Sequence, residues 1–138
     1  MQKIVLDTNV VVASLISNGI PFKIINELAF ENKVTVCISG PIFDEYVEVL
    51  SRPKFSVFKD FKSRAETFIT KIQEVAVKFS PDITLNVISD EADNRFLELS
   101  VHAKANYLIT GNTNDFTEDK YENVDIVTPR EFWDKYSE

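Results

Sequence analysis

Residues 3–16 have the sequence KIVLDTNVVVASLI, and this stretch decides the fold. The segment 3–7, with its apolar run at residues 4–6, is typical of a short buried strand that ends on an acid. Residues 7–9, with the sequence DTN, favour the start of a helix. The apolar residues 10–16 are therefore predicted to be helical. A strand that passes directly into a helix is the usual opening unit of an α/β fold.

The rest of the chain is predicted to continue this alternation of strands and helices. Further strands are expected at residues 35–38, 83–87, 107–110 and 124–127. Further helices are expected at residues 21–32, from the cap at 39–41 to residue 50, at 62–79, at 90–105, and after the capping-box sequence TPRE at 128–131. This order predicts a three-layer, Rossmann-like α/β/α sandwich around a mostly parallel sheet of four to five strands.

The length of 138 residues, with no linker, repeat or low-complexity stretch, predicts one domain spanning residues 1–138. No apolar run approaches the roughly 18–20 residues that span a bilayer, and the N-terminus lacks the pattern of a signal peptide. Cys37 is the only cysteine, which excludes an internal disulfide and fits a reducing compartment. We therefore expect a cytoplasmic protein that has no membrane partner.

The net charge of −7 argues against a protein that simply coats nucleic acid, because phosphate contacts need Lys and Arg. The charge is uneven, however: residues 51–64, called the basic segment below, have a net charge of +4, and residues 112–138 have −5. The basic segment is a candidate RNA-binding rim, and an ordinary solvated surface explains it equally well. Its basic residues are Arg52, Lys54, Lys59, Lys62 and Arg64.

Four acidic residues occupy positions that suggest more than a surface role: Asp7, Glu45, Asp93 and Asp115. Asp7 and Asp115 follow predicted strands, and in a parallel sheet the working site lies beyond the C-terminal strand ends. Asp93 falls in the apolar stripe of its predicted helix, and Glu45 lies beside the inward face of another. Carboxylates that are held together against their own repulsion usually bind a cation. The four acids therefore predict a metal site.

Each acid also has a structural explanation. Asp7 can cap the helix that follows it, and Asp93 can stabilise a helix N-terminus behind an N-cap at Asp90. Glu45 can be an ordinary boundary residue, and Asp115 lies among residues that favour turns. The agreement of four acids at one end of one sheet favours the metal site more strongly than any single acid does.

Three segments together resemble the PIN domain family: DTN at residues 7–9, DNRFLE at residues 93–98 and TGNTNDF at residues 110–116. Glu45 lies between the first two in the expected order, and the resemblance covers essentially the whole chain. The sequence EVLSRPKF at residues 48–55 is similar to one bacterial branch of this family. That branch consists of toxin components of toxin–antitoxin pairs related to VapC toxins.

The resemblance implies a ribonuclease that binds Mg²⁺ or Mn²⁺ and cuts a phosphodiester bond with metal-activated water. Asp7, Glu45, Asp93 and Asp115 would form its acidic, metal-binding and catalytic quartet. Relatives in this branch often have Asp where this chain has Asn112, which leaves open how the fourth acidic position is completed. The supporting polar residues would be Asn9, Thr110, Asn112 and Asp90. An RNA substrate, a homodimer and a small antitoxin partner are implied in the same way.

Other functions are weighed by the residues that they would require. A PIN fold that binds RNA or a protein with weak or no catalysis remains open, because four acids do not establish turnover. A phosphatase of the haloacid-dehalogenase kind needs a second Asp two residues after Asp7, where this chain has Asn9. One His and one Cys exclude a zinc site of the usual kind.

Overall fold

The computed structural model describes residues 1–88, 90–113, 116 and 119–137. Six strands within this part of the chain form one sheet in the order β3-β2-β1-β4-β6-β5. The strands are β1 (Lys3–Leu6), β2 (Thr35–Ser39), β3 (Val77–Phe79), β4 (Tyr107–Ile109), β5 (Lys120–Tyr121) and β6 (Val124–Val127). All neighbouring strands are parallel except β5 and β6, which form an antiparallel hairpin.

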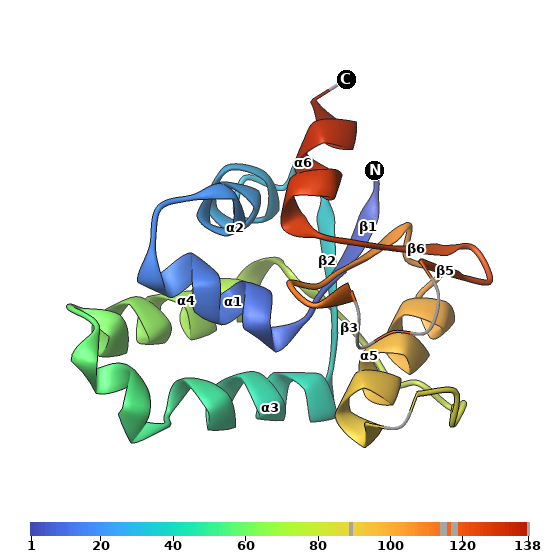
Figure 1. Cartoon of the computed structure of the whole chain (residues 1–138), viewed down its shortest axis with the longest axis horizontal. Helices are drawn as coiled ribbons and strands as arrows, with labels where there is room; N and C mark the ends of the chain where they lie inside the picture. Colours follow the sequence, from blue (N-terminus) through green and yellow to red (C-terminus); the bar gives the residue numbers. More distant parts are fainter. Residues whose placement is uncertain (89, 114–115, 117–118, 138) are drawn as a thin grey trace.

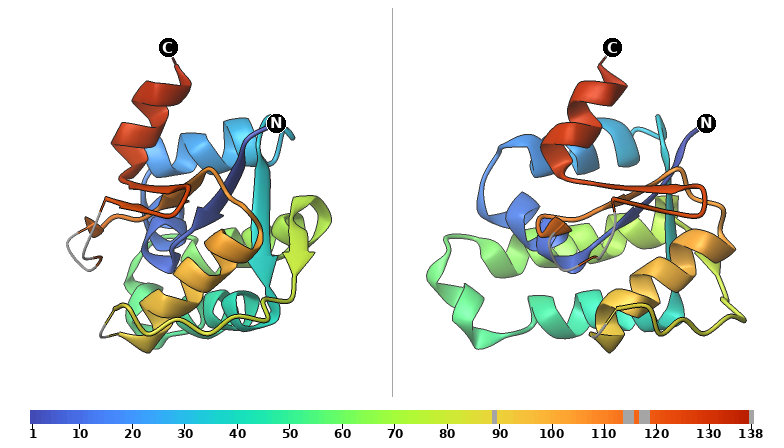
Figure 2. Two further views of the ribbon diagram at one scale, coloured as in Figure 1. Left: turned by 90° about the vertical axis from the view of Figure 1, so that its right-hand side faces the viewer. Right: turned by 45° about the vertical axis from the view of Figure 1, so that its right-hand side comes forward.

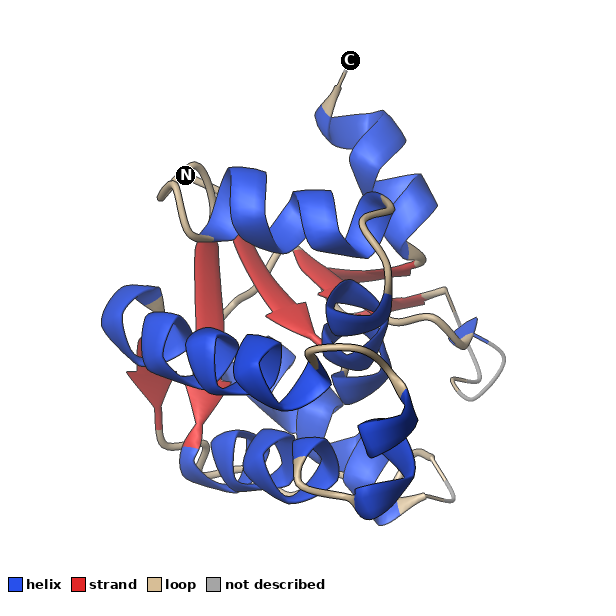
Figure 3. Ribbon diagram, turned by 90° about the vertical axis from the view of Figure 1, so that its left-hand side faces the viewer, coloured by secondary structure: helices blue, strands red, loops and turns tan. Residues whose placement is uncertain are grey.

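Helices cover both faces of this sheet (Figure 1). They are α1 (Thr8–Ile16), α2 (Ile20–Lys23), the π-helix η1 (Ile24–Ala29), α3 (Gly40–Leu50), the 3₁₀ helix η2 (Pro53–Val57), α4 (Phe61–Val75), α5 (Glu91–His102) and α6 (Pro129–Tyr136). The crossovers from β1 to β2 and from β2 to β3 run one way across the sheet, and the crossover from β3 to β4 runs back. Because such crossovers are right-handed, α1 to α4 lie on one face and α5 on the other, an arrangement that can be followed in Figures 2 and 3.

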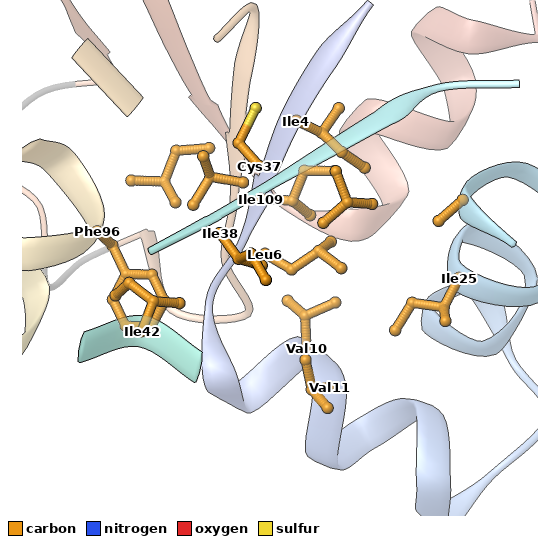
Figure 4. Packing of buried hydrophobic residues seen from close by; sticks show 14 of the residues in the cluster. Ile4, Leu6, Val10, Val11, Ile25, Cys37, Ile38, Ile42, Phe96 and Ile109 are labelled. Atoms are coloured by element: carbon orange, nitrogen blue, oxygen red, sulfur yellow. The ribbon is translucent and has the colours of Figure 1, made fainter. Parts of the chain in front are cut away.

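The three-layer α/β/α fold with a mostly parallel sheet is thus confirmed, and the sheet has six strands where four to five were predicted. The centre of the sheet is β1, where Ile4, Val5 and Leu6 are fully buried because helices cover both faces. Figure 4 shows side chains from neighbouring strands packed around β1. Ile42 of α3 and Phe96 of α5, both labelled in this view, belong to one buried cluster, and these helices from the two sides of the sheet contact each other.

The prediction for residues 62–87 was wrong in two places. The helix expected to reach residue 79 ends at Val75, and residues 77–79 form β3, which pairs with β2 at the edge of the sheet. Residues 83–87 form no strand. No Gly or Pro marks the end of α4, and the apolar residues continue at helical spacing, so only pairing with β2 distinguishes this strand from the helix.

The helix predicted at residues 21–32 is also irregular. It begins as α2 and continues as the π-helix η1, in which Phe30 N–H donates to the carbonyl of Ile25 at 2.9 Å. The side chain of Asn26 donates to the carbonyl of Phe22 at 3.0 Å, and such side-chain bonds compete with regular helical pairing. Asn32, with a φ of 57°, ends the segment in the left-handed conformation.

Two predicted helix starts are confirmed in their hydrogen bonds. Thr128 and Glu131 form the reciprocal capping box, with 2.9 and 3.1 Å between the paired atoms. Asp90 caps α5 by accepting from Ala92 N–H at 2.8 Å.

No single helix in the described ranges has both the length and the apolar character to cross a membrane. The helix α1 together with α2–η1 meets those criteria only as a pair bent by 102°.

Candidate metal centre at the strand ends

The ends of β1 and β4 bring two of the predicted site residues side by side. Leu6 is paired with Ile109 in the parallel register, so the next residues, Asp7 and Thr110, both lie just beyond the sheet. Asp7 N–H still donates to the carbonyl of Ile109 at 2.9 Å. The chain crosses over in opposite directions from these two strands, and ligands of open α/β sheets bind at such a switch point.

The carboxylate of Asp7 is buried and held by a side-chain hydrogen bond. Only 8% of the residue is exposed. Its Oδ2 accepts from the Thr110 hydroxyl at 2.8 Å and from the Asn9 amide at 3.4 Å. Asp7 occupies the N-cap position of α1, but its side chain makes no capping hydrogen bond. Helix capping therefore does not account for this acid.

Asn9 ties the loop after β4 to the first turn of α1. Its Oδ1 accepts from Gly111 N–H at 2.9 Å, and its Nδ2 lies 3.4 Å from the Thr110 hydroxyl. The same hydroxyl accepts from Asn112 N–H at 3.1 Å. A Cβ at Gly111 would lie 3.3 Å from the Asn9 side chain, so this close approach favours glycine. The loop is thus fixed against Asp7.

Glu45 reaches the same place from α3. Ser39 caps this helix, accepting from Ile42 N–H at 3.3 Å. The Thr8 hydroxyl donates to the Glu45 carboxylate. The next residue, Tyr46, is fully buried and donates its hydroxyl to the carbonyl of Leu6 at 2.5 Å. Tyr46 therefore anchors α3 to the last residue of β1 and keeps Glu45 beside Asp7.

Burial and like charge shift the acidity of two groups at this site. The pKa of Asp7 is raised, mainly by burial and further by the charge of Glu45, while the Thr110 hydrogen bond lowers it. The backbone N–H groups of Asn9 and Thr8 also lower the pKa of Asp7, although Asp7 makes no capping hydrogen bond to α1. Burial first, and then the charges of Asp7 and Glu45, raise the pKa of Tyr46 well above its ordinary range. Its hydroxyl therefore stays protonated and keeps donating to β1.

The first turn of α5 holds Asp93, which is half-buried, directly behind the N-cap Asp90. Its neighbour Asn94 is buried and makes two hydrogen bonds to Ile88: Oδ1 accepts from the amide at 3.0 Å and Nδ2 donates to the carbonyl at 2.6 Å. Sequence reasoning missed this role of Asn94, although an amide beside an apolar stripe is a usable signal. Asn94 fixes the segment that leads into the Asp93 turn.

The structure brings Asp7 and Glu45 together, whereas Asp115 lies outside the described residues. Within the described ranges, no group of three or more Asp, Glu, His or Cys side chains is placed to hold a metal ion. The oxygen donors that are assembled still suit Mg²⁺ or Mn²⁺. These ions use one or two carboxylates and complete their shell with water and substrate oxygens. Asp93 and Asp115 remain predicted members of the site.

The five cations of the basic segment differ in their surroundings. Arg52 forms an ion pair with Glu48 at 2.8 Å on the exposed side of α3. Arg64 donates to the side chain of Asn18 at 3.1 Å. Lys54 lies 5.2 Å from the ring centre of Phe55. Across the described ranges, no ion pair is formed by the two remaining cations, Lys59 and Lys62.

The raised pKa of Asp7 has a consequence for stability without metal. The folded chain holds this proton more tightly than the unfolded chain, so stability is lost as the pH rises from the ordinary value of 3.8 through the raised value. Asp7→Asn removes this titration. In urea unfolding with EDTA, the stability of Asp7→Asn relative to wild type should increase from about pH 4 to about pH 7. A difference independent of pH would contradict the burial of the charge.

Comparison with known proteins agrees with this geometry. Residues 3–114 match the family described as PIN domain. An uncharacterized protein of Methanocaldococcus jannaschii, MJ1680, is 33% identical over 143 residues, which cover 97% of this chain and 91% of that relative. PIN domains have a nuclease-type fold, are generally nucleases and typically use divalent metal ions. The match covers most of the chain, and a buried acid stands at the end of the central strand. The chain therefore belongs to the PIN domain family.

Proposed function

We propose that this protein is a Mg²⁺- or Mn²⁺-dependent endoribonuclease. The observation that carries the proposal is the buried carboxylate of Asp7, which lies beside Glu45 at the switch point of the sheet. Two neighbouring carboxylates repel each other, and their arrangement is unfavourable without a positive charge between them. A divalent cation relieves this repulsion, and the family to which the chain belongs typically uses such ions.

The residues of the chain have separate tasks in this proposal. Bound metal would supply an activated water and neutralise charge on the phosphate. Asp7 and Glu45 would hold the metal through oxygen, with Asp93 and Asp115 as further acids. Thr110 fixes the orientation of the Asp7 carboxylate, and Tyr46 fixes α3 against β1. The exposed cations of the basic segment would contact RNA phosphates.

Metal binding is expected to stabilise the folded protein. At a Mg²⁺ or Mn²⁺ concentration 100 times the dissociation constant, the gain is about 2.7 kcal/mol. Thermal unfolding should therefore show a higher Tm in millimolar metal than in EDTA. Asp7→Asn should lose most of this rise, and Asp44→Asn should keep it because Asp44 is exposed on α3. An equal rise in wild type and Asp7→Asn would place the binding elsewhere on the molecule.

The activity is tested with a mixed RNA pool, incubated with purified protein in Mn²⁺ or in EDTA. Cleavage in Mn²⁺ that stops in EDTA supports the proposed reaction. Cleavage that continues in EDTA would contradict it and indicate a contaminant. RNA binding without cleavage in either condition would favour a binding module, the alternative that the four acids leave open.

The biological role that we propose is that of a cytoplasmic, homodimeric toxin neutralised by a small antitoxin. The support is the similarity of residues 48–55, with the sequence EVLSRPKF, to that branch of the family. Induced expression of the chain should arrest growth, and Asp7→Asn should abolish the arrest. Co-expression of a small open reading frame adjacent to the gene should relieve it. Growth unaffected by the wild-type chain would contradict the toxin role without touching the nuclease.

A further inference from the structure

The connection from β3 to α5 runs back along α5 before that helix begins. Residues 82–88, called the strap below, lie antiparallel to α5 (Figure 2). Burial alternates within the strap, since Ile83 and Leu85 are half-buried whereas Thr84 and Asn86 are exposed. Leu85 packs against the hydrophobic core. The segment that was predicted to be a strand is therefore attached to a helix instead of to the sheet.

Three polar side chains on one ridge of α5 hold the strap. They are spaced by four residues, which is about 40° around the helix and about 6 Å along it for each step. Their partners in the strap are spaced by three residues in the opposite direction. The three contacts are Asn94 with Ile88, Glu98 with Leu85, and His102 with Asp82.

These contacts weaken from the start of α5 toward its end. Asn94 is 4% exposed, donates to the carbonyl of Ile88 at 2.6 Å and accepts from its N–H at 3.0 Å. Glu98 is half-buried, and its Oε2 accepts one backbone N–H at 2.8 Å. The Asp82 carboxylate lies 3.4 Å from His102 Nδ1, but the Asp82 side chain is 83% exposed. Exposed ion pairs contribute little, so the strap is held most firmly beside the first turn of α5.

That first turn contains Asp93. Asp93 is the third residue of α5, and the two hydrogen bonds between Ile88 and Asn94 close the turn in which it lies. At 100° per residue, Asn94 projects about 100° from Asp93 around the helix, and Glu98 about 140°. Asn94 and Glu98 thus fix the backbone around Asp93 from another side of the helix.

Polar contacts rather than close packing hold the middle of the strap. A cavity of about 270 Å³ lies between the strap and α5, and Asn94 and Glu98 both line it. Glu91 and Arg95 of α5 also line this cavity, but within the described part of the chain neither forms a hydrogen bond with the strap. Loss of a single contact is therefore expected to loosen the strap.

We propose that Asn94 and Glu98 are positioning residues of the metal centre, which hold the strap along α5 and thereby fix Asp93 where it meets the metal. The inference rests on the proposed function, in which Asp93 is one of the acids of the metal centre. It assigns a task to two polar residues of the sequence DNRFLE that the acidic quartet does not use. Glu98, although an acid, serves as a hydrogen-bond acceptor and not as a metal ligand.

The physical reason is the order that the strap imposes on the first turn of α5. Helix ends open locally when few contacts hold them. A metal that binds to a loosened turn must order it again, and this cost is subtracted from the free energy of binding. Loss of the contact should therefore weaken metal binding although every proposed ligand is still present.

The test is Mn²⁺ binding to the full chain, measured by isothermal titration calorimetry. Glu98→Ala should weaken binding about tenfold, because partners that orient metal ligands typically change affinity 10- to 100-fold. Glu98→Gln should bind Mn²⁺ like wild type, since its carbonyl oxygen can still accept the Leu85 N–H. An equal loss in Glu98→Gln and Glu98→Ala would assign the effect to the charge of Glu98 and would overturn the proposal.

Glu91→Ala is the matched control for charge. It removes a carboxylate from an exposed position on the same helix, closer in sequence to Asp93 than Glu98 is. Because exposed charges are screened, Glu91→Ala should change the Mn²⁺ affinity by about twofold at most. A loss as large as that of Glu98→Ala would contradict a role for the strap.

Hydrogen exchange in EDTA gives a second measurement that needs no metal. Amide exchange in residues 82–88 should be faster in Glu98→Ala and Asn94→Ala than in wild type, and Glu98→Gln should restore slow exchange. His102→Ala should have the smallest effect on exchange and on Mn²⁺ affinity, since its partner is exposed. Weakened Mn²⁺ binding with unchanged exchange of the strap would overturn the proposal. The Glu98 variants decide the question even if the buried change Asn94→Ala prevents folding.

Failure of this inference can be distinguished from failure of the proposed function. Wild type that binds no Mn²⁺ at millimolar concentration would contradict the metal centre, and with it the positioning role. Wild type that binds Mn²⁺ and Glu98→Ala that binds it equally well would overturn the positioning role alone.

Discussion

Asp7→Asn is expected to lower Mn²⁺-dependent RNA cleavage by at least about 100-fold, because loss of even an outer partner of a metal ligand typically costs 10- to 100-fold. Asp7 would itself contact the metal. Asn has the same shape, and its carbonyl oxygen can still accept the Thr110 hydroxyl that now bonds to Asp7 Oδ2 at 2.8 Å. The fold should therefore survive while the charge that holds the cation is lost. Initial cleavage rates of a labelled RNA give the measurement.

The loss can be separated from unfolding by the direction of the stability change. Burial disfavours the charged form of Asp7, so Asp7→Asn should be at least as stable as wild type at neutral pH in EDTA. Asp44→Asn, on the exposed side of α3, should cleave at the wild-type rate. Cleavage by Asp7→Asn at more than about a tenth of the wild-type rate would rule out Asp7 as a metal ligand.

The fold class was predictable because its main signals are local and agree with one another. The strand β1 and the start of α1 follow directly from the sequence DTN after an apolar run. The capping box at residues 128–131 forms as expected, since both partners lie within four residues. The edge strand β3 could not be predicted in this way. Its residues have the spacing of the preceding helix, and only the tertiary pairing with β2 makes them a strand.

The candidate site was predictable in its residues and less so in its contacts. The position of Asp7 at a strand end followed from topology. The contacts that keep Asp7 beside Glu45, however, join residues that are far apart in the sequence. The sequence analysis assigned no role to Tyr46, whose hydroxyl spans 40 positions to the carbonyl of Leu6. The amide of Asn94 beside an apolar stripe was a usable signal for a buried role, but its partner could not be predicted, because both hydrogen bonds are made to the backbone of Ile88.

The largest loss of stability is expected for Phe96→Ala. Phe96 is 1% exposed on α5 and belongs to the same buried cluster as Ile42 of α3, and these two contacting helices carry Asp93 and Glu45 (Figure 4). Such a truncation costs about 3–5 kcal/mol, or roughly 10 °C or more in Tm at this chain length. Val101→Ala, at a half-buried position on the same helix, should cost about 1 kcal/mol. Urea unfolding followed by Trp133 fluorescence measures both. Equal losses would mean that α5 is not held to α3 through Phe96, and the placement of Asp93 would need another support.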